Sequence, residues 1–169
     1  MNKIRLIFIP LAVTLAVLLV RFVMEAAEAG GRSYLNITYL IPVFAVYLSY
    51  VSVVKDMGFG GFQVTFLLYT LAVRLSVILL SLAGEASGLG GSYFAAGNIF
   101  FLIVPPLLFW PAAAFIVGTF LWPAVAMFTS GHQVAYRGVA ICGGVILVIT
   151  FIGIPYGISS LYTGGLGRR

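Results

Sequence analysis

Arg74 is the residue of this sequence best placed to do chemistry, because it lies at the centre of an apolar stretch, residues 62–83. The length and composition of this stretch predict a membrane helix. A central arginine costs about 2.5–3.5 kcal/mol on membrane-insertion scales, so its side chain normally faces protein or water. At about 100° per residue, several other polar side chains fall within about 60° of one another on this face of the helix. They are Gln63, Thr70, Ser81 and, if the helix extends that far, Glu85.

This polar face predicts a site for binding or for contact with a partner. Glu85 would lie about 16 Å from Arg74 along the helix axis, too far for a direct ion pair. We expect no other acidic residue at mid-membrane, so the guanidinium needs carbonyls, tyrosine hydroxyls, Asn98, water, a bound anion or another subunit. Three interpretations are open: an arginine satisfied inside the bundle, a contact to a partner subunit or anionic lipid, and an arginine that coordinates a substrate or ion.

A second apolar stretch, residues 34–54, predicts a helix with two distinct faces. One face is a polar and aromatic stripe made of Asn36, Tyr39, Tyr47 and Tyr50. The opposite face carries small residues such as Ala45 and Ser49, which indicate close helix packing. Aromatic belts at the membrane interfaces account for most of the stripe. Tyr47 does not fit such a belt, so we predict that it belongs to the binding or partner-contact residues.

The sequence lacks the residue sets on which most enzyme and cofactor chemistry depends. One histidine, one cysteine and four acidic residues cannot supply bis-histidine haem ligation or a complete zinc site. No glycine-rich phosphate-binding pattern is present. A Ser–His–acid triad would require His132, expected in a loop, to meet one of these few acids. We therefore predict a protein that is not an enzyme and has neither a metal site nor a cofactor.

The composition predicts an all-α integral membrane protein with a single domain, residues 1–169. Hydrophobic residues make up 62% of the chain and charged residues 8%, and the mean hydropathy is +1.16. No soluble domain of this length could bury so much apolar surface. The apolar runs do not alternate as the strands of a membrane barrel would. The net charge of +5 lies at segment ends, which indicates contact with lipid headgroups rather than nucleic acid.

The first apolar segment predicts a helix over residues 4–24 that remains uncleaved, with Lys3 and Arg5 at its start. Arg21 and Glu25 are four residues apart and can pair on one helix face. We interpret them as an ordinary ion pair on a solvated helix end. The alternative is an acidic edge where a partner docks.

The last apolar segment predicts a helix over residues 139–162. Gly143, Gly153 and Gly157 share one side of it, and the last two have the spacing that permits close helix contact. We expect this side to pack within the bundle or against another subunit.

The longest apolar segment, residues 93–128, is the hardest to place in a membrane. As one straight helix it would be about 54 Å long, against about 30 Å of hydrocarbon. Because residues before proline avoid the α region, we expect a helix end at Val104 and a new helix from Pro106 to about Phe128, kinked at Pro123. This predicts about five transmembrane helices with a proline-broken fourth segment. The alternatives are about six crossings, which the positive-inside rule favours, or a re-entrant hairpin over 93–128.

The sequence lacks the residue sets for catalysis and cofactor binding, and its helices have faces made of small residues. Both features favour a small non-catalytic subunit of a larger membrane complex. Its expected partners are membrane lipid and other membrane subunits, in a homo- or hetero-oligomer, and no nucleic acid. The alternative is an oligomeric channel or carrier for a small or anionic solute, lined by the polar face around Arg74. The compact chain and short loops favour a bacterial inner membrane with the N-terminus in the cytoplasm.

Overall fold

The computed structural model describes residues 3–27, 35, 37, 40–88 and 99–130, together with short pieces at 138, 141 and 143–145. Within these residues the chain is all-helical, with no strand. The main elements are α1 (Lys3–Ala26), α2 (Leu40–Val54), α3 (Phe59–Ala86) and α4 (Ile99–Ser130).

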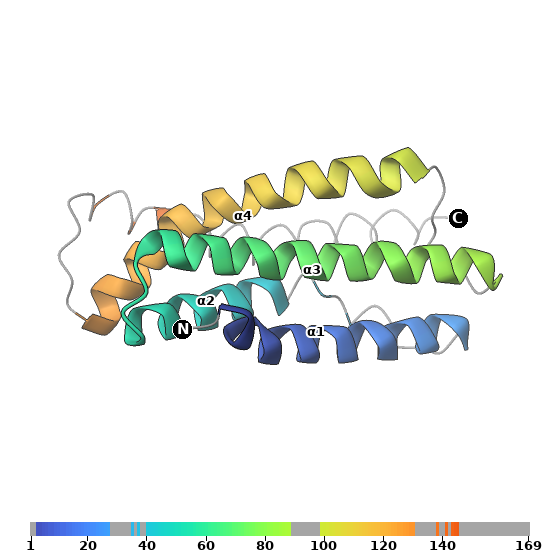
Figure 1. Ribbon diagram of the computed structural model, residues 1–169, viewed down its shortest axis with the longest axis horizontal. Helices are drawn as coiled ribbons and strands as arrows, with labels where there is room; N and C mark the ends of the chain where they lie inside the picture. The colour runs from blue at the N-terminus through green and yellow to red at the C-terminus, as the bar shows by residue number, and fades with distance from the viewer. Residues whose placement is uncertain are drawn as a thin grey trace, which may run out of the picture.

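These helices lie side by side along the long axis of the molecule, and successive helices run in opposite directions (Figure 1). α3 is the central helix, since it contacts each of the other three. α4 also packs along α2, whereas α1 packs mainly on α3. The core therefore forms around α3, where Phe62, Phe66 and Tyr69 are almost completely buried.

Three of the described helices are long and apolar enough to cross a membrane: Leu6–Ala26, Phe59–Ala86 and Leu107–Thr129. Large apolar side chains such as Phe8, Leu79 and Leu108 point outward, with about two thirds of their surface exposed. Lipid would cover such side chains in a membrane. The described part of the chain thus has the helix lengths and composition of a membrane protein. The helix predicted over 139–162 lies almost entirely outside the described residues.

α2 is shorter than the sequence predicted, because it begins at Leu40 instead of residue 34. Leu35 is not helical and Ile37 forms a 3₁₀ turn. Pro42 gives a physical reason, since proline is favoured in the first turn of a helix, where its missing N–H costs nothing. The fifteen residues of α2 span only about 22 Å. This helix alone is shorter than the hydrocarbon core of a bilayer.

α4 is one helix from Ile99 to Ser130, so the predicted helix end at Val104 and the hairpin alternative are both wrong. Each proline removes one backbone hydrogen bond from the helix. A break in apolar surroundings would leave several backbone groups without partners, which costs more. The tendency of the residue before a proline to avoid the α-helical region is therefore outweighed. The last part of α4, drawn in orange in Figure 1, bends away from the line of its yellow part, and Pro123 lies in this bent part of the sequence.

The turn between α2 and α3 is short and closes the C-terminus of α2 in a Schellman motif. The Met57 N–H donates to the Ser52 carbonyl at 2.7 Å, and the Asp56 N–H donates to the Val53 carbonyl at 3.0 Å. Asp56 takes the left-handed conformation that this motif requires, with φ of 51°. Glycine is the usual residue at this position, because side chains with a Cβ are strained there.

Replacing Asp56 with glycine is expected to raise the free energy of unfolding by about 0.5–1 kcal/mol, since glycine enters this conformation without steric cost. Replacing it with alanine is expected to lower the free energy of unfolding by about 1 kcal/mol. Thermal unfolding in a mild detergent measures both changes. A lower melting temperature for Asp56→Gly than for the wild type would contradict the assignment of this motif.

Candidate functional site

The polar face of α3 is turned away from the outer surface of the bundle. Gln63, Thr70 and Ser81 are buried, and Arg74 between them is half-buried. The Gln63 amide reaches α4, where its Nε2 donates to the Phe115 carbonyl at 3.1 Å and to Thr119 Oγ1 at 3.3 Å. The Thr70 hydroxyl donates within its own helix, to the Leu67 carbonyl at 2.9 Å.

Gly118 of α4 is what allows Gln63 to lie so close to the α4 backbone. A Cβ built on Gly118 would lie 2.5 Å from Gln63 Oε1 and 2.9 Å from its Cδ. Both distances are shorter than van der Waals contact. The missing side chain of Gly118 therefore makes the space in which the Gln63 amide forms its two hydrogen bonds.

Arg74 stacks on an aromatic ring of α4. Its guanidinium carbon lies 3.4 Å from the centroid of the Trp110 ring. A cation over a tryptophan face is attracted by the ring quadrupole, with an energy of about 0.5–1 kcal/mol at exposed sites and about 2 kcal/mol when desolvated. Arg74 therefore contributes to packing between α3 and α4. The sequence alone does not pair these two residues, because nothing in the local pattern relates positions so far apart.

A small pocket opens beside Trp110, between α2, α3 and α4, with a volume of about 30 Å³. Its walls are Ile41, Pro42, Ala45, Phe66, Thr70, Trp110, Ala113, Ala114 and Val117. The space is large enough for a water molecule, but a bound water also needs polar partners. The exposed lining is apolar, and the Thr70 hydroxyl is already used within α3. This pocket does not offer an anion the polar groups that it requires.

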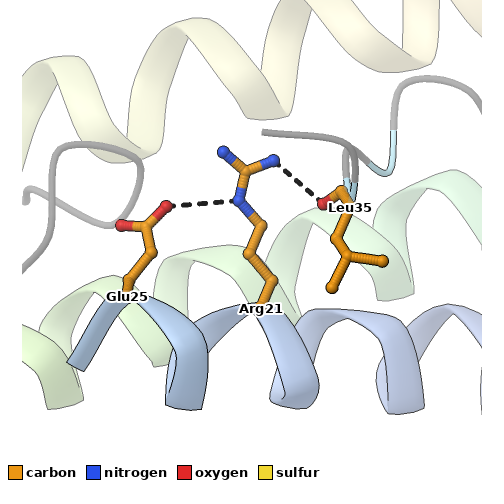
Figure 2. A network of polar contacts seen from close by, with 3 residues as sticks. All are labelled: Arg21, Glu25 and Leu35. Carbon is orange, nitrogen blue, oxygen red and sulfur yellow. Dashed lines mark hydrogen bonds and ion pairs between the residues drawn. The ribbon is translucent and has the colours of Figure 1, made fainter. Parts of the chain in front are cut away.

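The ion pair near the end of α1 is buried, so its interpretation as a solvated helix end is wrong. Arg21 and Glu25 are only 7% and 5% exposed, and Arg21 Nε lies 3.2 Å from Glu25 Oε1. Arg21 Nη1 also donates to the Leu35 carbonyl at 2.9 Å (Figure 2). Leu35 is non-helical, and its carbonyl is thus satisfied by a side chain in place of a helical N–H. The local sequence gives no signal of this burial, and the contact with the Leu35 carbonyl comes from outside the helix.

Two further polar contacts join helices that are distant in sequence. The Thr14 hydroxyl donates to the Pro10 carbonyl at 2.8 Å and lies 2.8 Å from the Tyr69 hydroxyl, which connects α1 to α3. Trp122 Nε1 donates to Ser52 Oγ at 2.9 Å, which connects α4 to α2. Neither contact is predictable from the sequence, since a single hydroxyl on a helix gives no signal of its partner.

The remaining predicted site residues are not brought together by the described structure. Tyr47 lies on an exposed part of α2, with 37% of its surface accessible. Gly143 is buried, and a Cβ on it would overlap the Phe120 side chain of α4. Asn98, Gly153 and Gly157 lie outside the described residues.

Within the described residues, no three His, Cys, Asp or Glu side chains lie close enough together to hold a metal ion. Comparisons with protein-family models, with curated proteins and with solved structures found no match.

Proposed function

We propose that this chain is a small non-catalytic subunit of a larger membrane protein complex. The observation that carries the proposal is the use of the α3 polar face for packing. Gln63 bonds to α4, and Arg74 stacks on Trp110 of the same helix. Residues with the chemistry to act on a substrate serve instead to hold helices together.

The pocket beside Thr70 gives no support to the alternative, an oligomeric channel or carrier. A route for an anionic solute needs polar groups at membrane depth. The pocket next to Thr70 is apolar and has a volume of only about 30 Å³. A binding interface with other subunits needs no such route, because apolar helix surface and close packing are sufficient.

We further propose that the membrane is a bacterial inner membrane and that the N-terminus lies in the cytoplasm. Lys3 and Arg5 begin α1 and Lys55 follows α2, and the start of α1 lies in the same half of the bundle as the end of α2 (Figure 1). Basic residues at one end favour a cytoplasmic location for that end.

Purification of the tagged chain from its native membranes in mild detergent tests the proposal. We expect it to co-purify with other membrane polypeptides in a constant ratio that survives a second affinity step on the partner.

Arg74→Leu is expected to lower the thermal stability of the chain and to leave the set of partners unchanged, with Arg74→Lys as the matched control. Recovery only as a lone monomer, also after cross-linking in the membrane, would contradict the proposal. Solute flux in reconstituted vesicles that Arg74→Ala abolishes would favour the carrier.

A further inference from the structure

The last turn of α4 carries the most exposed large apolar side chain of the described residues. Phe128 has 84% of its surface accessible, against 70% for Phe8 and Leu108, which point outward from α1 and α4. Between Ile116 and Phe128 every side chain of α4 is buried or half-buried. Phe128 is therefore separated from the outward apolar face to which Leu108 and Ile116 belong, and it emerges at a different place on the molecule.

Phe128 lies beyond the level of the charged α2–α3 turn. Trp122 Nε1 donates to Ser52 Oγ at 2.9 Å, so α4 and α2 are level there, and both helices run toward the same end (Figure 1). Lys55 follows Ser52 by three residues and Phe128 follows Trp122 by six, or about 4.5 Å and about 9 Å of helix. The end of α4 also reaches past the α2–α3 turn in Figure 1.

Lipid tails are not available to cover a side chain at this level. Lys55 and Asp56 in the turn are both exposed, and charged side chains in hydrocarbon face protein or water instead of lipid. With 32 residues, α4 is about 48 Å long and exceeds the roughly 30 Å of hydrocarbon. Trp122 belongs to a residue type that favours the membrane interface. The part of α4 that follows Trp122 is therefore the part that projects from the membrane.

The residues exposed at this end have the composition of a protein-binding surface. Phe128 and Val54 are apolar, with exposed fractions of 84% and 59%, and Lys55 and Asp56 are charged. Protein–protein interfaces combine an apolar centre, often with an aromatic residue, and a polar rim. Aromatic side chains that fill a pocket of the partner commonly dominate the binding energy.

We propose that a partner subunit docks on the projecting end of α4 and that Phe128 inserts into an apolar pocket in the extramembrane part of that subunit. The inference rests on the proposed subunit function and adds where the partner binds. The last turn of α4 contains no basic residue, and the carbonyl groups at a helix C-terminus favour cations. The pocket is therefore expected to carry lysine or arginine at its rim.

Labelling of Phe128→Cys with a water-soluble maleimide tests the proposal. The parent chain carries Cys142→Ser, because Cys142 is its one cysteine. In vesicles that hold the purified chain alone, opened so that the reagent reaches both faces, we expect rapid labelling, since only water covers position 128. In opened native membranes we expect labelling at least about tenfold slower, because the docked partner excludes water from this position.

Glu85→Cys and Leu108→Cys are the controls. Glu85 is exposed near the end of α3 and is expected to be labelled equally in both preparations. Leu108 lies in a candidate membrane span and is expected to stay unlabelled in both. Slow labelling of position 128 in the vesicles as well would show that lipid or a second copy covers Phe128 and would overturn the proposal. Equally rapid labelling in both preparations would also overturn it.

Phe128→Ala separates this docking site from the subunit function itself. It is expected to weaken binding of the co-purified polypeptide about thirtyfold, as at an aromatic hot spot, and to leave the melting temperature of the chain unchanged. Phe8→Ala, at a matched exposed position of α1, is expected to retain the polypeptide. A complex that Phe128→Ala leaves intact would overturn the docking site alone. A lone monomer in the purification would contradict the subunit function, so the two failures are distinguishable.

Discussion

Replacing Glu25 with leucine is expected to lower the free energy of unfolding by about 3–5 kcal/mol, because the change leaves a buried arginine beside an apolar side chain. Arg21 is 7% exposed, and the Glu25 carboxylate 3.2 Å from its Nε balances its charge. An exposed pair of the same spacing would contribute only about 0.3–0.5 kcal/mol. The size of the effect therefore separates a buried pair from a solvated one. Thermal unfolding in detergent, followed by circular dichroism, measures it.

The double variant Arg21→Met/Glu25→Leu is the control for this prediction. Apolar residues of similar size often replace a buried ion pair at little cost. The remaining loss is expected to be about 1–3 kcal/mol, because the Leu35 carbonyl, which accepts from Arg21 at 2.9 Å, loses its donor. A Glu25→Leu variant as stable as the wild type would restore the interpretation of Arg21 and Glu25 as a solvated helix end.

Replacing Gly118 with alanine is expected to lower the free energy of unfolding by about 1–3 kcal/mol, which is the cost of leaving buried polar groups without hydrogen bonds. Two effects oppose each other here. Alanine favours the helix over glycine by about 1 kcal/mol, but its Cβ would lie 2.5 Å from Gln63 Oε1. Gln63 must then withdraw from the Phe115 carbonyl and from Thr119. We expect the loss of these contacts to outweigh the gain in helix propensity.

A double-mutant cycle with Gln63→Ala isolates this contact. Gln63→Ala alone is expected to destabilise the chain, because both hydrogen bonds to α4 are lost. In the Gln63→Ala background, Gly118→Ala is expected to be neutral or stabilising, since the clash is gone and only the helix propensity remains. Melting temperatures of the four proteins in detergent measure the coupling. Additive effects would show that Gln63 and Gly118 do not meet.

Individual helices were predictable to different degrees, and the reasons are physical. α3 was expected over 62–83 and is found over Phe59–Ala86, because a long apolar run of membrane length admits few other structures. α2 was expected to begin at residue 34 and begins at Leu40. The apolar pattern continues upstream of Pro42, so hydrophobicity alone did not locate the start. α4 was expected to break at its prolines and does not, because local backbone preference is weaker than the need to satisfy buried backbone groups.

The candidate site was likewise predictable only in part. The sequence by itself determined the helical membrane class and the inward polar face of α3, because both follow from composition and from the angular spacing of residues within one helix. Only the tertiary structure decided that Arg74 stacks on Trp110, that Gln63 bonds across to α4 beside Gly118, and that Arg21 donates to the Leu35 carbonyl. Such contacts join residues between fourteen and fifty-six positions apart. They depend on how whole helices pack together, and helical periodicity carries no information about that.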